Sequence, residues 1–385
     1  MLHNVSLRKL TFLAAGPFIA DMMAMLVVCA IIVHANHLNM TPLQIGCMGA
    51  AYSLAYAFTA HYAGRWVKPR FAMVVLMISL PVAAVFNTVA SQVNSLALLL
   101  GASTLTGVAV GHYFTPFQIK MGKVKPFTTL AWTVGFYNIC WATGYATGAF
   151  SGCFLRSLED PTWLILAAWI LAAVHTAIAM AAHYDPSPDT QEYHASVAFN
   201  STATQRWSGW IAILVAMFLL NGAMYTLWPA MAKAGKLRDI QMAVGMLLLA
   251  IPIPLTNFIW PRARKLMLRP WLIACLLVGM GAGFLLLPIT PWPFTVAPLM
   301  LVGVGAGGLF FHTVYYSNGD AQNPGHSIGM NELMVGMGGV IGPPILGALA
   351  GKGEPSALPY FCGAALAVLA SVAIPLVWRA RSIRS

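Results

Sequence analysis

Apolar runs of about 20 residues, separated by short polar segments, follow one another along the whole chain. A helix of about 20 apolar residues crosses the roughly 30 Å hydrocarbon layer of a bilayer. The pattern therefore predicts twelve membrane-spanning helices, at residues 10–35, 42–64, 71–91, 95–119, 128–153, 161–183, 208–230, 240–260, 270–289, 293–317, 326–350 and 357–378.

The longest polar stretch follows the sixth of these helices and is rich in Ser, Thr, Asp, Glu and Gln. Such a composition is typical of a flexible linker between two units. We therefore expect a six-helix bundle at residues 1–184, a cytoplasmic linker at 185–207 and a second six-helix bundle at 208–385.

The second half of the chain repeats small and polar residues of the first at a nearly constant offset. The clearest set, Gly135, Asn138, Gly144 and Gly148, recurs 194 residues later as Gly329, Glu332, Gly338 and Gly342. Parallel repeats of this size in an apolar chain are typical of secondary transporters whose halves move around a central site. The predicted fold class is an all-α integral membrane protein with twelve transmembrane helices in two pseudo-symmetric six-helix bundles.

Composition supports a membrane location. Hydrophobic residues make up 59% of the chain and charged residues only 8%, whereas soluble domains carry about 25% charged residues. The net charge of +11 does not indicate a nucleic-acid partner, because the basic residues form short clusters between apolar runs. None of the six cysteines has metal-ligand spacing, so we expect no metal and no cofactor.

Basic residues predict the orientation, since cytoplasmic loops of membrane proteins carry an excess of Lys and Arg. With the N-terminus in the cytoplasm, sixteen of the 21 Lys and Arg residues fall in inner loops and termini. The other five fall in outer loops: Arg156, Lys233, Lys236, Arg238 and Lys352. We therefore expect a multi-pass protein of the cell's inner membrane with both termini cytoplasmic.

Twelve spans, a linker after the sixth and two parallel halves resemble the major facilitator superfamily over the whole chain. The fifth predicted span is similar to the glycine motif that this superfamily's antiporters carry, with Gly135, Gly144, Gly148 and Gly152 in the motif's spacing. Ala149 stands where relatives usually have proline, and Gly64, after the second span, stands where they have an acidic residue that latches the inner side. The resemblance implies alternating access, and the glycine motif favours efflux; tight helix packing is the alternative explanation of the glycines.

Only two acidic residues lie inside the predicted spans, Asp21 and Glu332. A charge within a bilayer costs roughly 2.5–3.5 kcal/mol on insertion scales, so such residues usually have a function. By the resemblance, the first, fourth, seventh and tenth spans line the central cavity, so Asp21 is expected to face substrate or water. A carboxyl there can gain and lose a proton, which proton coupling requires. The alternative for both residues is a polar contact between helices.

His112 and His312 lie in two of the expected cavity spans, at a depth similar to that of Glu332. Two imidazoles and a carboxyl in one layer would form a proton relay. We therefore predict proton-coupling roles for Asp21, Glu332, His112 and His312. The alternative for each histidine is a hydrogen-bonded core residue.

Aromatic and amide side chains complete the predicted lining of the cavity. The predicted substrate-binding residues are Asp21, Tyr113, Phe117, Asn138, Trp141, Asn221, Tyr225, Asn331 and Glu332. An aromatic cavity of this kind suits an amphipathic or weakly basic organic solute. Anions fit badly, because none of the predicted spans contains Arg or Lys, unless a basic residue from an outer loop reaches the cavity.

These observations predict a monomeric, proton-coupled secondary transporter that exports a small organic compound by alternating access, with the proton gradient as its energy source. One alternative is a proton symporter that takes up a neutral or cationic nutrient. A second alternative is a non-transporting scaffold or sensor on the same fold. We do not expect an enzyme, since no convincing nucleophile–base or metal constellation stands out in the sequence.

Overall fold

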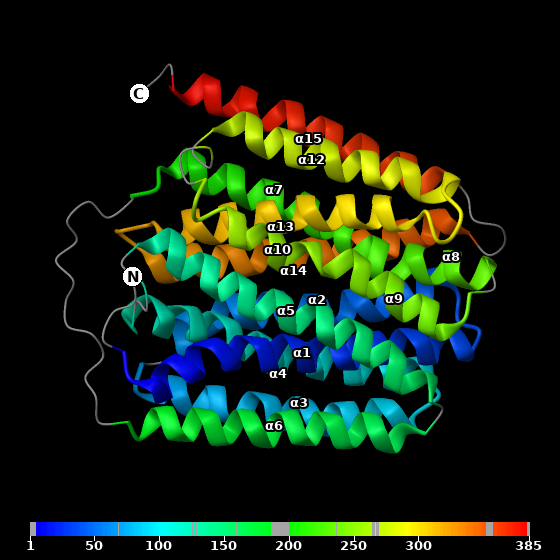
Figure 1. Ribbon diagram of the computed structural model, residues 1–385, viewed down its shortest axis with the longest axis horizontal. Helices are drawn as coiled ribbons and strands as arrows, with labels where there is room; N and C mark the ends of the chain where they lie inside the picture. Colours follow the sequence, from blue (N-terminus) through cyan, green and yellow to red (C-terminus); the bar gives the residue numbers. More distant parts are fainter. Residues whose placement is uncertain are drawn as a thin grey trace.

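Long helices that run side by side make up most of the protein (Figure 1). The computed structural model describes residues 5–67, 69–124, 127, 129–158, 160–185, 200–235, 237–263, 266, 269–351 and 357–382. The first half contains α1 (Leu7–His37), α2 (Pro42–Trp66), η1 (Pro69–Phe71), α3 (Ala72–Gln92), α4 (Leu96–Val124), α5 (Leu130–Ser157) and α6 (Pro161–His183).

The second half repeats this order with several interrupted helices. It contains α7 (Ala203–Gly222), η2 (Ala223–Leu227), α8 (Trp228–Ala234), α9 (Asp239–Ala250), α10 (Pro252–Ile259), α12 (Pro270–Leu286), η3 (Leu287–Ile289), α13 (Val296–Asn318), α14 (Pro324–Ala350) and α15 (Leu358–Ser382). The seventh predicted span corresponds to α7, η2 and α8, and the eighth to α9 and α10. The described residues thus contain the twelve helical spans that the apolar pattern predicts.

Ten of these twelve segments are long and apolar enough to cross a membrane by length and composition, within the described residues. The two others are α2 and α5. Both are interrupted by tyrosines and other polar residues, such as Tyr56 and Asn138, which are buried against other helices. Polar side chains of these two helices are therefore covered by other helices.

Two helices, one in each half, begin with the same local signal. Thr41 caps α2 by accepting a hydrogen bond from the backbone N–H of Gln44, and the Gln44 side chain accepts one from Thr41 in return. Thr202 and Gln205 repeat this reciprocal capping at the start of α7. Such capping boxes satisfy backbone donors that the first turn of a helix leaves free, so these two starts are fixed by local sequence.

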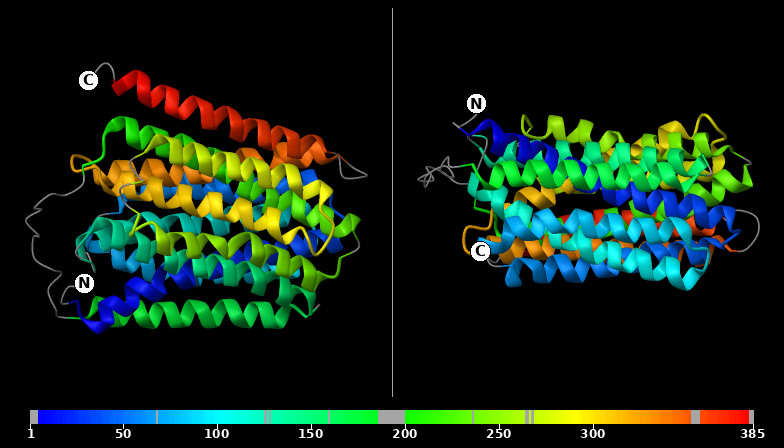
Figure 2. Two further views of the ribbon diagram at one scale, coloured as in Figure 1. Left: turned by 45° about the horizontal axis from the view of Figure 1, so that its top comes forward. Right: turned by 90° about the horizontal axis from the view of Figure 1, so that it is seen from below.

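The same helix pairings occur in both halves. In the first half α1 packs along α5, and α3 packs against α4 and α6; in the second half α7 packs along α14, and α12 packs against α13 and α15. Figures 1 and 2 show the outer pairs at opposite edges, with α3 and α6 along one and α12 and α15 along the other. The two halves meet where α2 packs on α14 and where α5 packs on α9 and α10.

Glycines allow helices within each half to approach closely. A Cβ atom at Gly144 of α5 would overlap the backbone carbonyl of Phe18 in α1, and one at Gly338 of α14 would lie 2.5 Å from the carbonyl oxygen of Leu214 in α7. These residues occupy equivalent repeat positions. Their main structural effect is therefore to join α5 to α1 and α14 to α7, rather than to join the two halves.

Both ends of the described chain lie at the same end of the bundle, where α1 begins and α15 ends (Figure 1). We call this the terminal end and the other the opposite end. Several residues used to predict orientation lie outside the described residues: Lys68, Lys125, Lys236, Arg264, Lys265, Lys352 and Arg384. Most of the expected linker, residues 186–199, also lies outside them.

Candidate functional site

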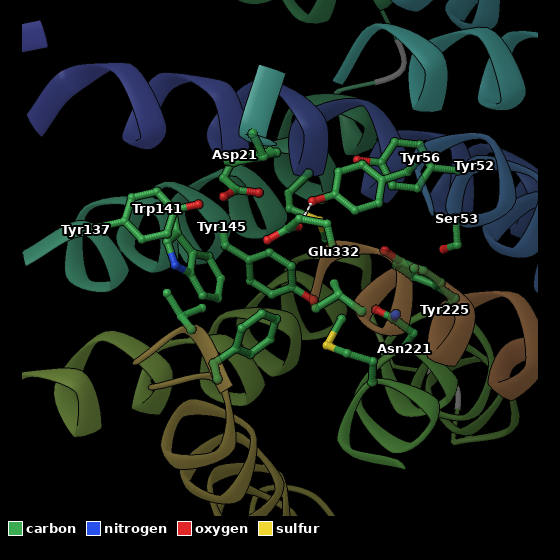
Figure 3. Close-up of a pocket in the computed structure, with 17 residues that line it drawn as sticks. Asp21, Tyr52, Ser53, Tyr56, Tyr137, Trp141, Tyr145, Asn221, Tyr225 and Glu332 are labelled. Atoms are coloured by element: carbon green, nitrogen blue, oxygen red, sulfur yellow. Dashed lines mark hydrogen bonds between the residues drawn. The ribbon is translucent and has the colours of Figure 1, made fainter. Parts of the chain in front are cut away.

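A cavity lies between the two halves at the centre of the bundle (Figure 3). Helices α1, α2, α4 and α5 line it from one half, and α7, η2, α13 and α14 from the other. Its wall is largely aromatic, with Tyr52, Tyr56, Phe114, Tyr137, Trp141, Tyr145, Tyr225 and Phe310. Asp21 and Glu332 are its acidic residues, and no arginine or lysine is among the described residues that line it.

The cavity is small in this conformation. The space open to the centres of water molecules is about 80 Å³, and one water needs about 10–15 Å³ by the same measure. Pockets for drug-sized ligands span about 300–1,000 Å³. The structure therefore shows the cavity contracted around room for a few waters, and an organic solute can enter only if the lining helices move apart.

Asp21 projects into this cavity from the middle of α1, four residues after Pro17. Its carboxyl has no hydrogen-bond or ion-pair partner among the described residues, and it lies close enough to Glu332 for the two carboxyls to interact electrostatically. Figure 3 shows the two side chains pointing toward the same space. Four tyrosines line the cavity with Asp21: Tyr52, Tyr137, Tyr145 and Tyr225.

Glu332 is held quite differently. The Tyr56 hydroxyl donates a hydrogen bond to one carboxyl oxygen of Glu332, and the amides of Gln118 (2.7 Å) and Asn331 (3.1 Å) donate to the other. Tyr56 and Gln118 come from α2 and α4, and Asn331 comes from α14, so the network joins the two halves. Thr313 extends it to α13 by donating to the Asn331 carbonyl oxygen at 2.7 Å.

Asn138, at the repeat position of Glu332, makes the equivalent contact on the other side of the molecule. Its amide nitrogen donates to the Asn257 carbonyl oxygen of α10 at 2.8 Å, across the contact between the halves. The Trp141 indole donates to the Asn138 carbonyl oxygen at 2.9 Å, which fixes this ring at the cavity wall. One inter-half contact is therefore built from neutral amides and its repeat partner from a carboxyl.

The predicted substrate-binding residues fall into two layers. Five of them line the cavity: Asp21, Trp141, Asn221, Tyr225 and Glu332. Asn138 and Asn331 lie behind and bond to lining residues. Tyr113 and Phe117 stack on each other at 5.6 Å between ring centroids, behind the wall and next to Gly16.

Asn221 and Tyr225 share a face, although the helix between them changes its pitch. Residues Ala223–Leu227 form a π-helical turn, a feature that is frequent at functional sites. Asn221 also lies near the repeat position of Asp21, and both line the cavity. An amide and a carboxyl thus occupy related positions in the two halves.

The predicted layer of His112, His312 and Glu332 is not formed. Neither histidine lines the cavity with Glu332, and the described residues contain no group of three His, Cys, Asp or Glu side chains that could hold a metal ion. Each ring instead bonds through Nδ1 to a carbonyl one turn earlier in its own helix, Val108 at 2.9 Å and Gly308 at 2.6 Å. The reason is helical geometry: the lining residues Phe114 and Phe310 are two positions away, and residues two apart point to different faces.

Several lining residues were not singled out from the sequence, among them Tyr52, Ser53, Tyr56, Tyr137 and Tyr145. A signal was present, because Tyr52 and Tyr56 are four residues apart and therefore share one helix face. They also lie in one of the two least apolar helices. Polar aromatic residues one turn apart in a weakly apolar span could have indicated a cavity-facing helix.

A second cavity lies between the halves at the opposite end of the bundle, with about 240 Å³ open to the centres of water molecules. The α1–α2 turn, η2, α8 and the ends of α14 and α15 surround it. Lys233 lines this cavity and donates to the Asn39 side chain at 3.1 Å. The outer-loop lysine therefore does not reach the central cavity, which stays without a described basic residue.

Comparisons with known proteins agree with this architecture. The sequence model of the Major Facilitator Superfamily matches residues 13–317. Among solved structures, the human organic anion transporter MFSD10 (TETRAN) is similar, with a TM-score of 0.69 and 12% sequence identity. The match covers 96% of this chain and 100% of that one. At this identity the likeness concerns the fold. No curated protein matches the chain.

Proposed function

Because the chain belongs to the major facilitator superfamily of membrane transporters, we propose that it carries a small, weakly basic organic solute across the membrane in exchange for protons. The protein is a multi-pass membrane protein, and the proposed substrate site is its central cavity. The observation that carries the proposal is the unpaired Asp21 carboxyl in an aromatic cavity that lacks described basic residues.

A cation meets two kinds of partner in this cavity. The Asp21 carboxylate supplies the opposite charge, and the surrounding tyrosine rings attract a cation through their electron-rich faces. Desolvated cation–π contacts contribute about 2 kcal/mol each. An anion would meet two carboxyls and no compensating charge, so the cavity favours an amphipathic amine over a carboxylate or phosphate.

Coupling follows from competition for one carboxyl. A proton and a cation both neutralise Asp21, so binding of either lowers the affinity for the other, and this coupling is reciprocal. The contracted cavity opens first to one side and then to the other as the halves move. Release of the cation on the side rich in protons and return of a protonated Asp21 would complete an exchange cycle.

Export is the direction we propose. The glycine spacing of α5 matches the superfamily's antiporter motif, and the terminal end then faces the cytoplasm of a cell whose inner membrane holds the protein as a monomer. His112 and His312 have no direct part in this mechanism, since both lie away from the cavity. Trp141, Asn221 and Tyr225 form the apolar and hydrogen-bonding wall around the solute.

Proton symport of a neutral or cationic nutrient is the second candidate. The observation that favours it is the closeness of two carboxyls, Asp21 and Glu332, in one cavity. One carboxyl could carry the proton while the other binds the substrate. Symport and exchange predict opposite movements of solute for the same pH gradient, so one assay separates them.

The test uses purified protein and a panel of organic amines. A ligand at about 100 times its dissociation constant stabilises the protein by roughly 2.7 kcal/mol, which a thermal shift detects. If the amine competes with protons for Asp21, it should raise the unfolding temperature of the parent more at pH 8 than at pH 5.5. Asp21→Asn should show no such difference. The variant Asp160→Asn, whose carboxyl caps α6 outside the cavity, is the control.

Reconstituted vesicles then give the direction of coupling. Exchange requires that a proton-rich lumen drives the amine inward, whereas symport requires that the same gradient drives it outward. A protein that binds amines in neither pH condition and moves none of them would instead support the scaffold or sensor alternative.

A further inference from the structure

We propose that each cycle exchanges one monovalent cation for one proton at Asp21, while Glu332 remains ionised, so that transport moves no net charge. This inference rests on the proposed cation–proton exchange and concerns its ratio. It is argued from the different partners of the two carboxyls in one cavity.

The partners of Glu332 suit its ionised form. Tyr56, Gln118 and Asn331 all present hydrogens to its oxygens, and an ionised carboxylate acts only as an acceptor. Gln118 also turns its NH₂ toward the Tyr137 hydroxyl at 3.1 Å. Its own carbonyl oxygen is buried without a partner among the described residues. Three donors therefore face the Glu332 carboxyl in the closed state.

When the terminal end opens, water replaces the hydrogen-bond donors of Glu332. Glu332 lies in the first third of α14, which begins at the terminal end (Figure 1). If the halves separate there, the carboxyl loses Tyr56 and Gln118 and meets water instead. A glutamate side chain in contact with water is ionised at neutral pH. Hydrogen-bond donors in the closed state and water in the open state therefore both favour the ionised form of Glu332.

Asp21 lacks the hydrogen-bond donors that hold Glu332 in the closed state. It faces the cavity with no hydrogen-bond partner among the described residues, and the cavity opens alternately to both sides. Near the repeat position in the other half stands Asn221, which has no charge to exchange. One exchangeable carboxyl gives room for one proton or one positive charge per cycle, so transport of a doubly charged solute would move one net charge across the membrane.

The experiment measures accumulation of ethidium, a monovalent cation, in vesicles that contain the full-length protein, with protein-free vesicles subtracted. A one-to-one exchange predicts about tenfold accumulation at equilibrium for each pH unit of gradient, since tenfold corresponds to about 1.4 kcal/mol. A two-to-one exchange predicts about a hundredfold. Imposing a potassium diffusion potential with valinomycin should leave the one-to-one plateau unchanged.

Two sets of variants assign the charges. Glu332→Gln and Tyr56→Phe should change the rate but keep the tenfold plateau, whereas Asp21→Asn should abolish accumulation driven by the pH gradient. Tyr56→Phe keeps the carboxyl and the ring, so it tests the assignment even if Glu332→Gln fails to fold.

The outcomes that overturn the inference are distinct. A plateau that follows the membrane potential, or that falls to background in Glu332→Gln while the variant remains folded, contradicts the ratio but leaves exchange itself standing. If the parent accumulates neither ethidium nor any of the amines that bind to it, the proposed function fails and the ratio fails with it.

Discussion

At the scale of single residues, the two inter-half contacts show how one repeat position can acquire two chemistries. Asn138 bonds to Asn257 across one contact, and Glu332 bonds to Tyr56 across the other. Neutral amides keep their hydrogen bonds at every pH, whereas a carboxyl responds to its surroundings. The structure therefore combines a pH-insensitive contact with a charged one on opposite sides of the same cavity.

The amide contact can be tested with Asn257→Leu. This change leaves the buried Asn138 amide without its partner, which costs about 1–3 kcal/mol, and loosens the anchor of Trp141. We expect a lower thermal unfolding temperature and weaker solute binding. The double variant Asn138→Leu/Asn257→Leu should recover part of the stability, because both buried polar groups are then removed; additive losses would show that the two amides do not interact.

There is a physical reason why the sequence predicts some site residues and not others. Asp21 and Glu332 stand out because the cost of a charge in a bilayer is a property of the residue and its span alone. Which face of a helix reaches the cavity depends on rotation about the helix axis, which packing decides. His312 points away although Phe310, two residues earlier, lines the wall.

At the scale of elements, close helix pairs determine the shape of each half. Gly144 and Gly338 bring α5 onto α1 and α14 onto α7. The number and order of the helices follow from apolar length, so the sequence predicts them well. The interruptions at η2 and between α9 and α10 do not follow from apolar length, because they arise inside continuous apolar runs.

The substitution Gly144→Ala tests the α1–α5 contact. The added Cβ meets the backbone carbonyl of Phe18, which cannot move without moving α1. Overpacking of this kind typically costs 1–3 kcal/mol, so we expect a loss of about that size in thermal unfolding. Gly101→Ala is the matched control, since no atom lies within 4 Å of its Cβ position. Equal effects of the two changes would contradict the packing role.

The α13–α14 loop offers a pH-dependent prediction. Burial alone would raise the pKa of the Asp320 carboxyl, but hydrogen bonds from Ser327, Asn323 and Gln322 and the nearby Arg206 guanidinium together lower it. A lowered pKa stabilises the folded state above the ordinary value, and this contribution disappears as the pH falls through the lowered value.

We therefore expect Asp320→Asn to lower stability at pH 7 by about 1 kcal/mol, since the change removes a hydrogen-bonded charge whose Arg206 partner is partly exposed. The difference between parent and variant should shrink below about pH 4. Thermal unfolding of both proteins between pH 3 and pH 7 measures it. A difference that stays constant over this range would show that the charge has no role.

At the scale of the whole molecule, polar bridges join the halves at the opposite end. His37 of α1 lies 3.0 Å from the Asp239 carboxylate of α9, and Lys233 of α8 bonds to Asn39. In this conformation the central cavity is contracted, and at the same time these two contacts hold the halves together at the opposite end. Transport requires that the bridges break.

Covalent linkage of this end should therefore stop transport without stopping binding. We expect a thiol-reactive cross-linker to inhibit the Asn39→Cys/Lys233→Cys variant, made in a background without the six native cysteines, by at least tenfold. Thermal shifts with a bound amine should persist, because neither residue lines the central cavity. Continued transport after complete cross-linking would mean that the halves do not separate here.

The modest apolarity of α2 has a consequence for how the chain is made. A helix with several tyrosines and a histidine partitions weakly into lipid, and its polar face is covered by α14. During synthesis, nearly 260 residues separate the end of α2 from the start of α14. Throughout that interval the nascent first half must shield Tyr56 and its neighbours by other means, so a ribosome-bound chain that stops before α14 should be held by insertion factors or degraded.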